Sequence, residues 1–490
     1  QEKCLQAKKR RKAKAKGERR NQVTKKVCIE TFGCQMNVHD SERVVGLLEQ
    51  AGYDLTNDLE EADLVVVNTC SVRERAEDKL FNRLALLNAN RSPAAKQTLA
   101  VIGCVAQQEG ENIFTRAPGV DVVVGTQALR RLPVLVAQAE LSKTQHLDIN
   151  PYDNVSFPLG VAVRQDPVKA FITIIEGCND FCSFCVVPYT RGHERMRPAK
   201  EIIEEVHQAA DSGHVEIHLL GQIVNHYQAP DLTDCDFAKL LELVHDVPNL
   251  ERIRFASPHP RHVTSRMLDT MRDLPKVCRH LHLPAQSGST EILRAMRRRH
   301  SRGDYLRLVE KIRRTIPDIA LSTDMIVGFP GETHEQFEET ISLTETVGYH
   351  SMFSFKYSER PNTLAAQRLP DSVPESEKTA RIMELQAIQK SIQTALNKRQ
   401  VGQSVRVLVD SRSRKRHEEL SGRTSQNTVV NFPGKPEWIG HVVDVSVSRA
   451  GPNSLSGEVF ARDGHRSRAS ESLPTLAAEP RAQQEDTRPC

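Results

Sequence analysis

Residues 176–185 read EGCNDFCSFC and place three cysteines, Cys178, Cys182 and Cys185, within eight positions, directly after the apolar stretch FITII at 171–175. Thiolates are preferred ligands of soft metal centres, so this density suits a metal ion or an iron–sulfur cluster. Three cysteines this close cannot all pair as disulfides, and zinc would require a fourth cysteine or histidine nearby. Three thiolates on a [4Fe–4S] cluster would leave one iron open to a small ligand.

The sequence around this motif alternates short apolar runs with helical patterns. The runs are FITII at 171–175, VEIHLL at 215–220, RIRF at 252–255, HLHL at 280–283, IALSTDMIVGF at 319–329 and MFSFKY at 352–357. Six such runs predict a barrel or partial barrel of (βα) units, whose active sites lie at the carboxyl ends of the strands. The cysteine motif follows the first run, so it falls at that end. A polar helix at 375–398 is expected to leave this domain.

Residues 26–140 predict a separate open α/β domain with a parallel sheet. Its apolar runs are VCIETFGC at 27–34, ADLVVVNTC at 62–70, LAVIGC at 99–104 and VDVVVGT at 120–126, with a first helix expected from Asp40 to Gln50. Three runs end in a cysteine: Cys34, Cys70 and Cys104. Because ligands of open parallel sheets bind at the carboxyl ends of the strands, these three residues can converge on one site. The alternative is that each is a small buried hydrophobic residue.

Residues 401–463 change character again, to short alternating strands separated by Gly, Pro and Asn. This pattern predicts a small antiparallel β-barrel, a class of fold that often binds oligonucleotides. A basic loop supports that role, although a merely solvated charged loop fits equally; its residues are Arg412, Arg414, Lys415, Arg416 and Arg423. A linker is expected at 141–168.

The composition indicates a globular protein of two to four domains: 490 residues, 39% hydrophobic and 27% charged. No run approaches the ~18 apolar residues that a membrane helix needs. The net charge of +4 combines +10 in residues 1–26 with −6 elsewhere. We interpret 1–25 as a disordered basic tail, with a polyanion anchor or a mitochondrial presequence as alternatives, and 464–490 as a second disordered tail. No secretory pattern is seen, so a cytoplasmic location is expected.

Longer motifs identify a family. They are TFGCQMNVHDSE at 31–42, NTCSVRE at 68–74, GCVAQQEG at 103–110, GCNDFCSFCVVPYTRGHER at 177–195, HLPAQSGS at 282–289, STDMIVGFPGET at 322–333 and ELSGRTSQN at 419–427. The spacing of Cys178, Cys182 and Cys185 resembles the C-x3-C-x2-C signature of radical S-adenosylmethionine (SAM) proteins. Together with the longer motifs, it makes the chain resemble the bacterial MiaB-type tRNA methylthiotransferases over roughly residues 25–460. The resemblance implies an N-terminal methylthiotransferase domain, a radical-SAM partial (βα)6 barrel and a C-terminal TRAM domain that binds RNA.

The resemblance also implies two [4Fe–4S] clusters. One is an auxiliary cluster on Cys34, Cys70 and Cys104, and the other is the radical-SAM cluster on Cys178, Cys182 and Cys185. SAM would bind the open iron of the second cluster and, on reduction, give a 5′-deoxyadenosyl radical. The implied reaction replaces C2–H of N6-isopentenyladenosine at position 37 of tRNA by C2–SCH3. The C2–H bond is too strong and too weakly acidic to be broken by acid–base catalysis, so the reaction needs a radical.

Further expectations concern the SAM pocket and partners. The resemblance implies that seven residues line the SAM pocket: Phe184, Gly221, Gln222, Gln286, Ser287, Asp324 and Ile326. For each of them the alternative is packing at a strand end. The expected partners are tRNA, SAM and an electron donor such as flavodoxin or ferredoxin, with no membrane and a monomeric chain. The remaining cysteines are predicted to be bystanders: Cys4, Cys28, Cys235, Cys278 and Cys490.

Two departures from the family pattern leave other readings open. Ile223 stands where the family usually has the first Asn of GQNVN, and Met196 where it usually has Ser. Both replace polar groups near the expected SAM or substrate site. The alternatives are the same reaction on threonylcarbamoyl-adenosine or on a ribosomal protein, or a non-catalytic iron–sulfur protein that binds RNA.

Overall fold

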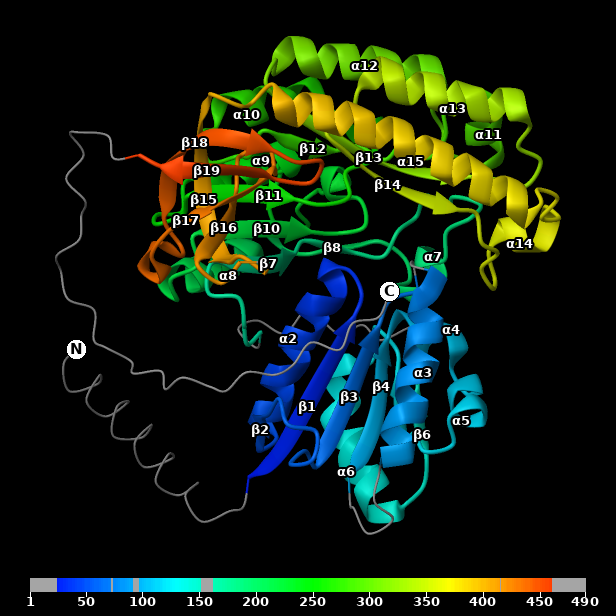
Figure 1. The fold of residues 1–490 in the computed structure, drawn as a ribbon. Helices are drawn as coiled ribbons and strands as arrows, with labels where there is room; N and C mark the ends of the chain where they lie inside the picture. The colour runs from blue at the N-terminus through cyan, green and yellow to red at the C-terminus, as the bar shows by residue number, and fades with distance from the viewer. Residues whose placement is uncertain (1–23, 72–73, 91–96, 151–161, 415, 461–490) are drawn as a thin grey trace.

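The computed structural model describes residues 24–71, 74–90, 97–150, 162–414 and 416–460. These residues include only the last two positions of the expected basic tail, and they exclude the expected tail at 464–490. Cys4, Lys415 and Cys490 also lie outside the described residues. Figure 1 shows three regions: an N-terminal α/β domain, a central barrel domain and a small C-terminal β domain beside the barrel. No helix in the described ranges is both long and apolar enough to cross a membrane.

The N-terminal domain is a six-stranded parallel sheet in the order β2-β1-β3-β4-β5-β6. Its strands are β1 (Lys25–Phe32), β2 (Tyr53–Leu55), β3 (Leu64–Thr69), β4 (Thr98–Gly103), β5 (Val122–Val124) and β6 (His146–Asp148). Its helices are α2 (Gln35–Gln50), α3 (Glu74–Asn90), α4 (Cys104–Glu109), α5 (Asn112–Arg116), the 3-10 turn η2 (Leu129–Arg131) and α6 (Leu132–Ser142). β3 and β4 are buried along their whole length, as expected for central strands covered on both faces.

Two details of this domain differ from the sequence prediction. Helix α2 begins at Gln35, five residues before Asp40; its first five residues have only Met36 and Val38 as apolar side chains, two positions apart, which is not a helical spacing. The predicted linker at 141–168 contains β6, which pairs with β5 from Val122–His146 to Val124–Asp148. A three-residue edge strand with one apolar side chain gives too short a pattern to be recognised in the sequence.

The central domain is a partial (βα)6 barrel. Its strands are β7 (Lys169–Thr173), β10 (Glu216–Leu220), β11 (Arg252–Phe255), β12 (His280–His282), β13 (Ala320–Val327) and β14 (Ser351–Lys356). They form two three-stranded parallel sheets, β11-β10-β7 and β12-β13-β14, and a parallel bridge between Ile253 and Val277 continues the order from one to the other. All six apolar runs therefore became barrel strands, in the predicted order.

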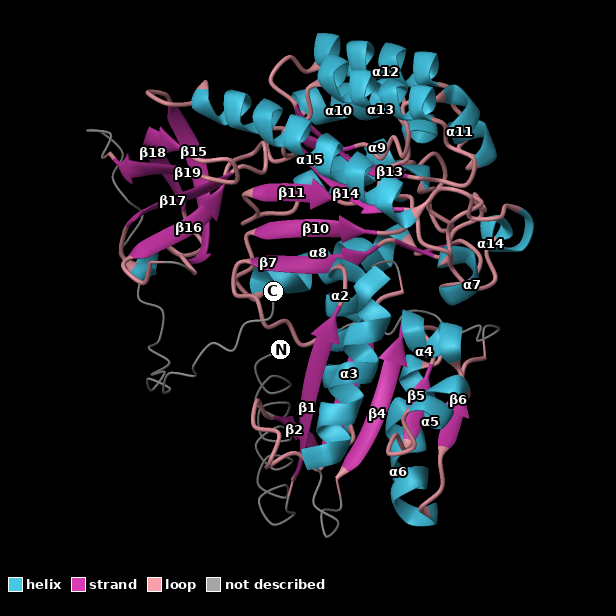
Figure 2. Cartoon of the chain, turned by 45° about the vertical axis from the view of Figure 1, so that its right-hand side comes forward, coloured by secondary structure: helices cyan, strands magenta, loops and turns pink. Residues whose placement is uncertain are grey.

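The remaining elements of this domain surround those strands (Figures 1 and 2). They are β8 (Ile175–Glu176), α7 (Val187–Thr190), β9 (Arg195–Met196), α8 (Ala199–Asp211), η3 (Val224–His226), α9 (Phe237–His245), η4 (Pro260–His262), α10 (Ser265–Asp273), α11 (Thr290–Ala295), α12 (Arg302–Thr315), α13 (His334–Val347), α14 (Leu364–Arg368) and α15 (Glu375–Lys398). The bounds of α15 are those predicted.

The two faces of the barrel strands differ in chemistry. One face packs against the helices in the largest hydrophobic core, with residues such as Ile217, Leu321 and Met325. Alternate residues point the other way, because successive side chains of a strand lie on opposite faces. That interior face carries His282, Asp324 and other polar groups, so the barrel interior is not a closed apolar core.

The C-terminal domain is a closed five-stranded barrel in the order β15-β16-β17-β19-β18. Its elements are β15 (Ser404–Arg412), β16 (Glu419–Arg423), β17 (Val429–Pro433), η5 (Pro436–Trp438), β18 (Val442–Ala450) and β19 (Leu455–Val459). The pairing is antiparallel except between β17 and β19, which pair in parallel at Val430–Leu455.

Two arginines of β11 attach this small barrel to the large one. Arg254 donates to the carbonyl oxygens of Thr424 at 2.7 Å and Ser425 at 3.3 Å. Arg252 donates to the carbonyl of Arg423. Both guanidinium groups are buried, so the carbonyls replace the water that these charges lose.

Candidate functional site

The first three cysteines converge at one edge of the N-terminal sheet. Strands β1, β3 and β4 are neighbours, and their last residues are in register: Phe32 pairs with Thr69, and Thr69 pairs with Gly103. Cys34, Cys70 and Cys104 follow these residues by one or two positions. Strands that end together thus bring together three cysteines that lie far apart in the chain. We call this set the auxiliary triad.

Buried asparagines fix the loops that carry the auxiliary triad. Asn37 and Asn68, both fully buried, bond to each other: Asn37 Nδ2 donates to Asn68 Oδ1 at 3.0 Å, and Asn68 Nδ2 donates to the Asn37 carbonyl at 2.9 Å. The Cys34 thiol donates to Asn37 Oδ1 at 3.3 Å. Gly103 (φ +95°) lies so close that a Cβ there would be 2.3 Å from Asn68 Oδ1. The asparagine pair therefore couples the positions of all three cysteine loops.

The auxiliary triad is a polar, partly ionised site. The neighbouring Cys70 thiol, aided by Arg191, lowers the pKa of Cys34 to about 6 despite burial. Burial raises the pKa of Cys104, with Arg191 again acting in the opposite direction. The hydroxyls of Thr69 and Ser71 flank Cys70 and, among the described residues, have no hydrogen-bond partner although they are buried. A cysteine-rich pocket with spare polar atoms fits an iron–sulfur cluster better than it fits an apolar core.

The other three cysteines, the loop triad, lie in the turn that follows β8. Gly177 (φ +81°) starts this turn, and a Cβ there would be 2.1 Å from the His193 carbonyl oxygen, so glycine is required. The turn is held by backbone bonds from Cys178 N to the Gly192 carbonyl (3.1 Å) and from Ser183 N to the Met296 carbonyl (3.0 Å). The loop is thus tied on both sides and lies at the carboxyl end of the first barrel strand.

Donors already point at the sulfurs of the loop triad. The Asp180 N–H lies 3.5 Å from Cys178 Sγ, and Arg298 Nη1 lies 3.6 Å from Cys182 Sγ. Burial raises the pKa values of Cys178 and Cys185 to about 12. Cluster binding requires thiolates and would therefore release protons here. The donor set and the hydrogen bonds to sulfur fit a [4Fe–4S] cluster.

Phe184, one of the expected SAM-pocket residues, lies within the loop triad, between Cys182 and Cys185. Phe184 packs against the small hydrophobic cluster that contains Ile326. Gly221 and Gln222 follow β10, and the buried Oε1 of Gln222 has no hydrogen-bond partner among the described residues. An unpaired buried acceptor at a strand end is suited to a donor such as the ammonium group of an amino acid.

Other predicted pocket residues have different surroundings. Gln286 (φ +74°) is bound through its backbone to β13, with its N–H on the Asp324 carbonyl and its carbonyl accepting from Ile326 N–H. Asp324 faces His282, whose Nε2 is 3.3 Å from Oδ2. The Ser287 hydroxyl is fully buried and accepts from the Ser289 N–H at 3.1 Å. Its contacts are those of strand-end packing, the alternative noted for these residues.

The two departures from the family pattern occupy different places. Ile223 is buried directly after Gln222. Met196 lies in β9, opposite Ile175, and its Sδ accepts from the Gln228 N–H at 3.1 Å. Met196 therefore serves local packing between two loops. Of the expected bystanders, Cys28 and Cys235 lie in hydrophobic cores, and Cys278 is buried beside Arg254.

Sequence reasoning missed the buried charges that flank both triads. Arg191 and Asp40 form an ion pair at 2.6 Å beside the auxiliary triad, and Arg298 lies beside the loop triad. Asp180, His259 and His262 form a further polar group next to the loop triad, with ligand atoms within 4.8 Å of one another. Arg191 and Asp180 lie in the motif at 177–195 and Asp40 lies in the motif at 31–42, but nothing local in the sequence shows which charges meet in the fold.

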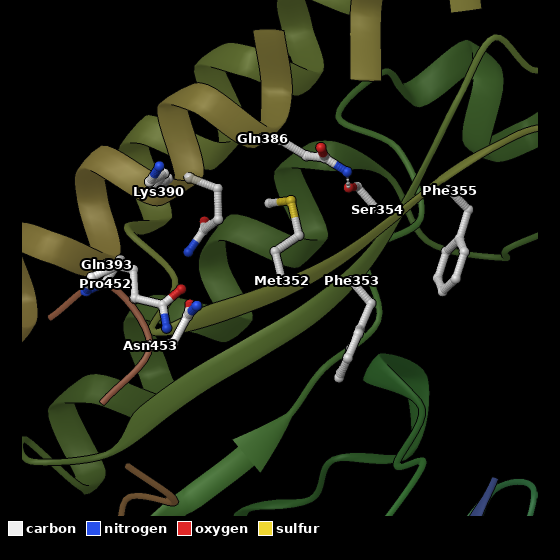
Figure 3. Close-up of a pocket in the computed structure, with 10 residues that line it drawn as sticks. Met352, Phe353, Ser354, Phe355, Gln386, Lys390, Gln393, Pro452 and Asn453 are labelled. Atoms are coloured by element: carbon white, nitrogen blue, oxygen red, sulfur yellow. Dashed lines mark hydrogen bonds between the residues drawn. The ribbon is translucent and has the colours of Figure 1, made fainter. Parts of the chain in front are cut away.

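Strand β14 separates two open surfaces. On one side, a cavity of about 480 Å³ lies between β14, α15 and the turn at Pro452 and Asn453. Figure 3 shows Met352 pointing towards α15, whereas Phe353 and Phe355 point away from it. These two rings are 59% and 37% exposed and belong to the barrel interior, where Phe353 pairs with Asp324. Interior aromatic rings left this open are available to a ligand.

Family comparisons agree with the three regions. Residues 26–125 match the Uncharacterized protein family UPF0004, residues 172–344 match the Radical SAM superfamily, and residues 398–460 match the TRAM domain. Among solved structures, the radical S-adenosylmethionine methyltransferase TsrM from Kitasatospora setae has a similar fold, with a TM-score of 0.53 at 15% identity over 70% of this chain and 77% of that one. The fold and the cysteine loop thus define a radical SAM protein with a TRAM domain.

Curated relatives narrow the class. The tRNA-2-methylthio-N(6)-dimethylallyladenosine synthase of Neisseria gonorrhoeae is 43% identical over 89% of this chain and 99% of its own length. The synthase of the same name from Bordetella bronchiseptica is 45% identical over 89% and 92%. The chain belongs to this family of tRNA-2-methylthio-N(6)-dimethylallyladenosine synthases.

Proposed function

We propose that this protein converts N6-isopentenyladenosine, also called N6-dimethylallyladenosine, at position 37 of tRNA to its 2-methylthio derivative, with SAM as methyl donor and radical source. The observation that carries the proposal is the presence of two separate cysteine triads at the facing ends of two domains. One triad suffices to cleave SAM, whereas sulfur insertion needs a second site that holds the sulfur.

The two sites would hold two [4Fe–4S] clusters, one on Cys34, Cys70 and Cys104 and one on Cys178, Cys182 and Cys185. Each triad would leave one iron open to a further ligand. When bound, the clusters supply the electron that cleaves SAM and the site that carries the sulfur.

The chain's own residues bind and orient the reactants. We propose that Gln222 Oε1 accepts from the amino group of SAM, and that Phe184 and Ile326 contact its adenosine. We also propose Asp324 and Gln286 as residues lining the pocket, as expected from the sequence. The contacts of Ser287 with Ser289 support a packing role for its hydroxyl.

The target base would enter the open barrel interior. A base in a folded RNA must leave its stack before an enzyme can reach it, and aromatic rings commonly receive such a base. Phe353 and Phe355 supply exposed rings on the interior face of β14. The TRAM domain, fixed to β11 by Arg252 and Arg254, would bind the adjoining RNA.

Other expectations remain part of this proposal. The reaction needs an external one-electron donor, for which a flavodoxin or ferredoxin is suited. A single chain contains both triads, which supports activity as a monomer. Because the proposed substrate is tRNA, we place the activity in the cytoplasm.

The proposal is tested by nucleoside mass analysis of tRNA from a deletion strain. Loss of 2-methylthio-N6-isopentenyladenosine, with restoration by the intact gene, is the expected result. Unchanged levels of that nucleoside would contradict the proposal. Anaerobic SAM cleavage by the reconstituted protein separates the enzyme from an RNA-binding protein, since a binder would release no 5′-deoxyadenosine.

A further inference from the structure

We propose that Arg191, a residue of the barrel domain, is a positioning residue of the auxiliary triad and provides the positive charge that sets the electrostatic potential there. The inference rests on the proposed function only in that the auxiliary triad binds an iron–sulfur cluster.

The guanidinium of Arg191 lies at the auxiliary triad although its backbone does not belong to that domain. Arg191 follows α7, six residues after Cys185 of the loop triad, and is only 5% exposed. Its Nη2 is 2.6 Å from Asp40 Oδ2 in α2. The positive charge of Arg191 opposes the rise that burial causes in the pKa of Cys104 and helps to lower the pKa of Cys34, so the guanidinium acts electrostatically on these two thiols. The charge therefore reaches two of the three cysteines.

Backbone contacts hold this segment against the N-terminal domain. The Thr190 carbonyl accepts from Thr126 Oγ1 at 2.5 Å, and the Arg191 carbonyl accepts from Gln127 Nε2 at 2.9 Å. Thr126 and Gln127 follow β5 of the N-terminal sheet. Two consecutive carbonyls bound to the other domain fix where the Arg191 side chain begins, so its position at the cysteines is built into the domain interface.

A buried cation beside an anionic cluster has a predictable effect. Cluster reduction adds negative charge, and a neighbouring positive charge favours the reduced form, so net charge and hydrogen bonds to sulfur tune the potential. Asp40 partly cancels the charge of Arg191. Removal of Arg191 should therefore lower the reduction potential of the auxiliary cluster, and neutralisation of Asp40 should raise it. A purely structural role predicts no such opposite signs.

Arg43 offers a matched control. Its Nη1 is 3.1 Å from Glu176 Oε1 and 3.8 Å from Asp40 Oδ1, so it also joins the two domains through carboxylates. Its substitution removes an interdomain ion pair without removing the guanidinium of Arg191.

The experiment uses the full chain with Cys182→Ala, which leaves the auxiliary site as the only complete triad. Arg191→Gln, Arg191→Lys, Asp40→Asn and Arg43→Gln are added singly, and the potential is measured by redox titration with electron paramagnetic resonance. We expect a lower potential for Arg191→Gln, a value near the parent's for Arg191→Lys and Arg43→Gln, and a higher one for Asp40→Asn.

The outcomes separate this inference from the proposed function. A parent without a cluster on the auxiliary triad would overturn both. A parent with a cluster whose potential is the same in Arg191→Gln, or falls in both Arg191→Gln and Asp40→Asn, would overturn the role of Arg191 alone. If Arg191→Gln does not fold, the sign of the shift in Asp40→Asn and the value in Arg191→Lys still decide the matter.

Discussion

The auxiliary triad and the loop triad reach similar donor sets by different routes. The auxiliary triad takes its cysteines from three strand ends spread over residues 34–104, and its order depends on sheet register and on the pair Asn37–Asn68. The loop triad takes them from residues 178–185, in one turn that backbone bonds tie to Gly192 and to the distant Met296. The first site needs the sheet to bring its ligands together, whereas the second has all three ligands in one segment and needs tertiary contacts only to hold that segment in place.

The buried arginines extend this contrast. Arg298 reaches Cys182 from the same domain, whereas Arg191 reaches Cys104 across a domain interface. The auxiliary triad is therefore the site that is sensitive to how the two domains sit on each other. Changes elsewhere in the interface should affect sulfur insertion before they affect SAM cleavage.

The largest expected effects come from the cysteines themselves. Cys34→Ala should abolish formation of the methylthio product and spare reductive cleavage of SAM, because only the auxiliary triad loses a ligand. Cys182→Ala should abolish both. Product nucleoside and 5′-deoxyadenosine measured in one reaction check the two variants together. Methylthio product from Cys34→Ala would show that the auxiliary triad has been wrongly assigned.

Asn68→Ala should damage the auxiliary triad alone. Asn68 donates to the Asn37 carbonyl and to Ser41 Oγ, and its loss leaves buried groups unpaired, at about 1–3 kcal/mol of unfolding free energy. We expect iron loss from the auxiliary site, with SAM cleavage retained. Denaturant unfolding of the apoprotein and iron analysis measure the two effects. Ser183→Ala is the matching variant for the loop triad, because Ser183 lies between two of its cysteines and donates one hydrogen bond to the Ala295 carbonyl.

Phe353→Ala tests the open barrel interior as the place where the target base binds. If the ring stacks on the target base, its loss costs about 1–3 kcal/mol of RNA binding, which raises KM for tRNA. SAM cleavage without RNA should not change. Leu141→Ala, an 86% exposed residue of the N-terminal domain, is the control. An unchanged KM for tRNA in Phe353→Ala would remove this residue from the substrate site.

The smallest expected effect is that of Met196→Ser, which restores the usual family residue. The variant loses the contact between Met196 Sδ and the Gln228 N–H, about 1 kcal/mol of stability or less. SAM cleavage should stay within about twofold of the parent, since about 0.4 kcal/mol separates twofold rates. A change of SAM cleavage beyond tenfold would show that Met196 lies closer to the chemistry than its contacts indicate.

The sequence predicted the loop triad and the barrel strands well because their patterns are local. Six apolar runs became β7 and β10–β14, and the motif at 178–185 follows the first barrel strand and β8, a two-residue strand that the sequence did not separate from it. Convergence of Cys34, Cys70 and Cys104 could also be expected, since parallel strands end at one edge. Short elements escaped, among them β2, β6, β8 and the early start of α2, because each is too short to give a recognisable apolar pattern.

The charges at the site could not be predicted in the same way. The pairs Arg191–Asp40 and Arg43–Glu176 join residues more than 130 positions apart, and only the packing of two domains brings them together. The orientation of Phe353 and Phe355 towards the barrel interior likewise depends on strand register, which a single sequence does not reveal.

The most direct test of the two-site account is anaerobic quantitation of iron and sulfide in the reconstituted chain. It is compared with two triple alanine variants, one at Cys34, Cys70 and Cys104 and one at Cys178, Cys182 and Cys185. Two [4Fe–4S] clusters predict about eight irons per chain and about four in each variant. About four irons in the parent, with no loss when the auxiliary triad is replaced, would contradict the account.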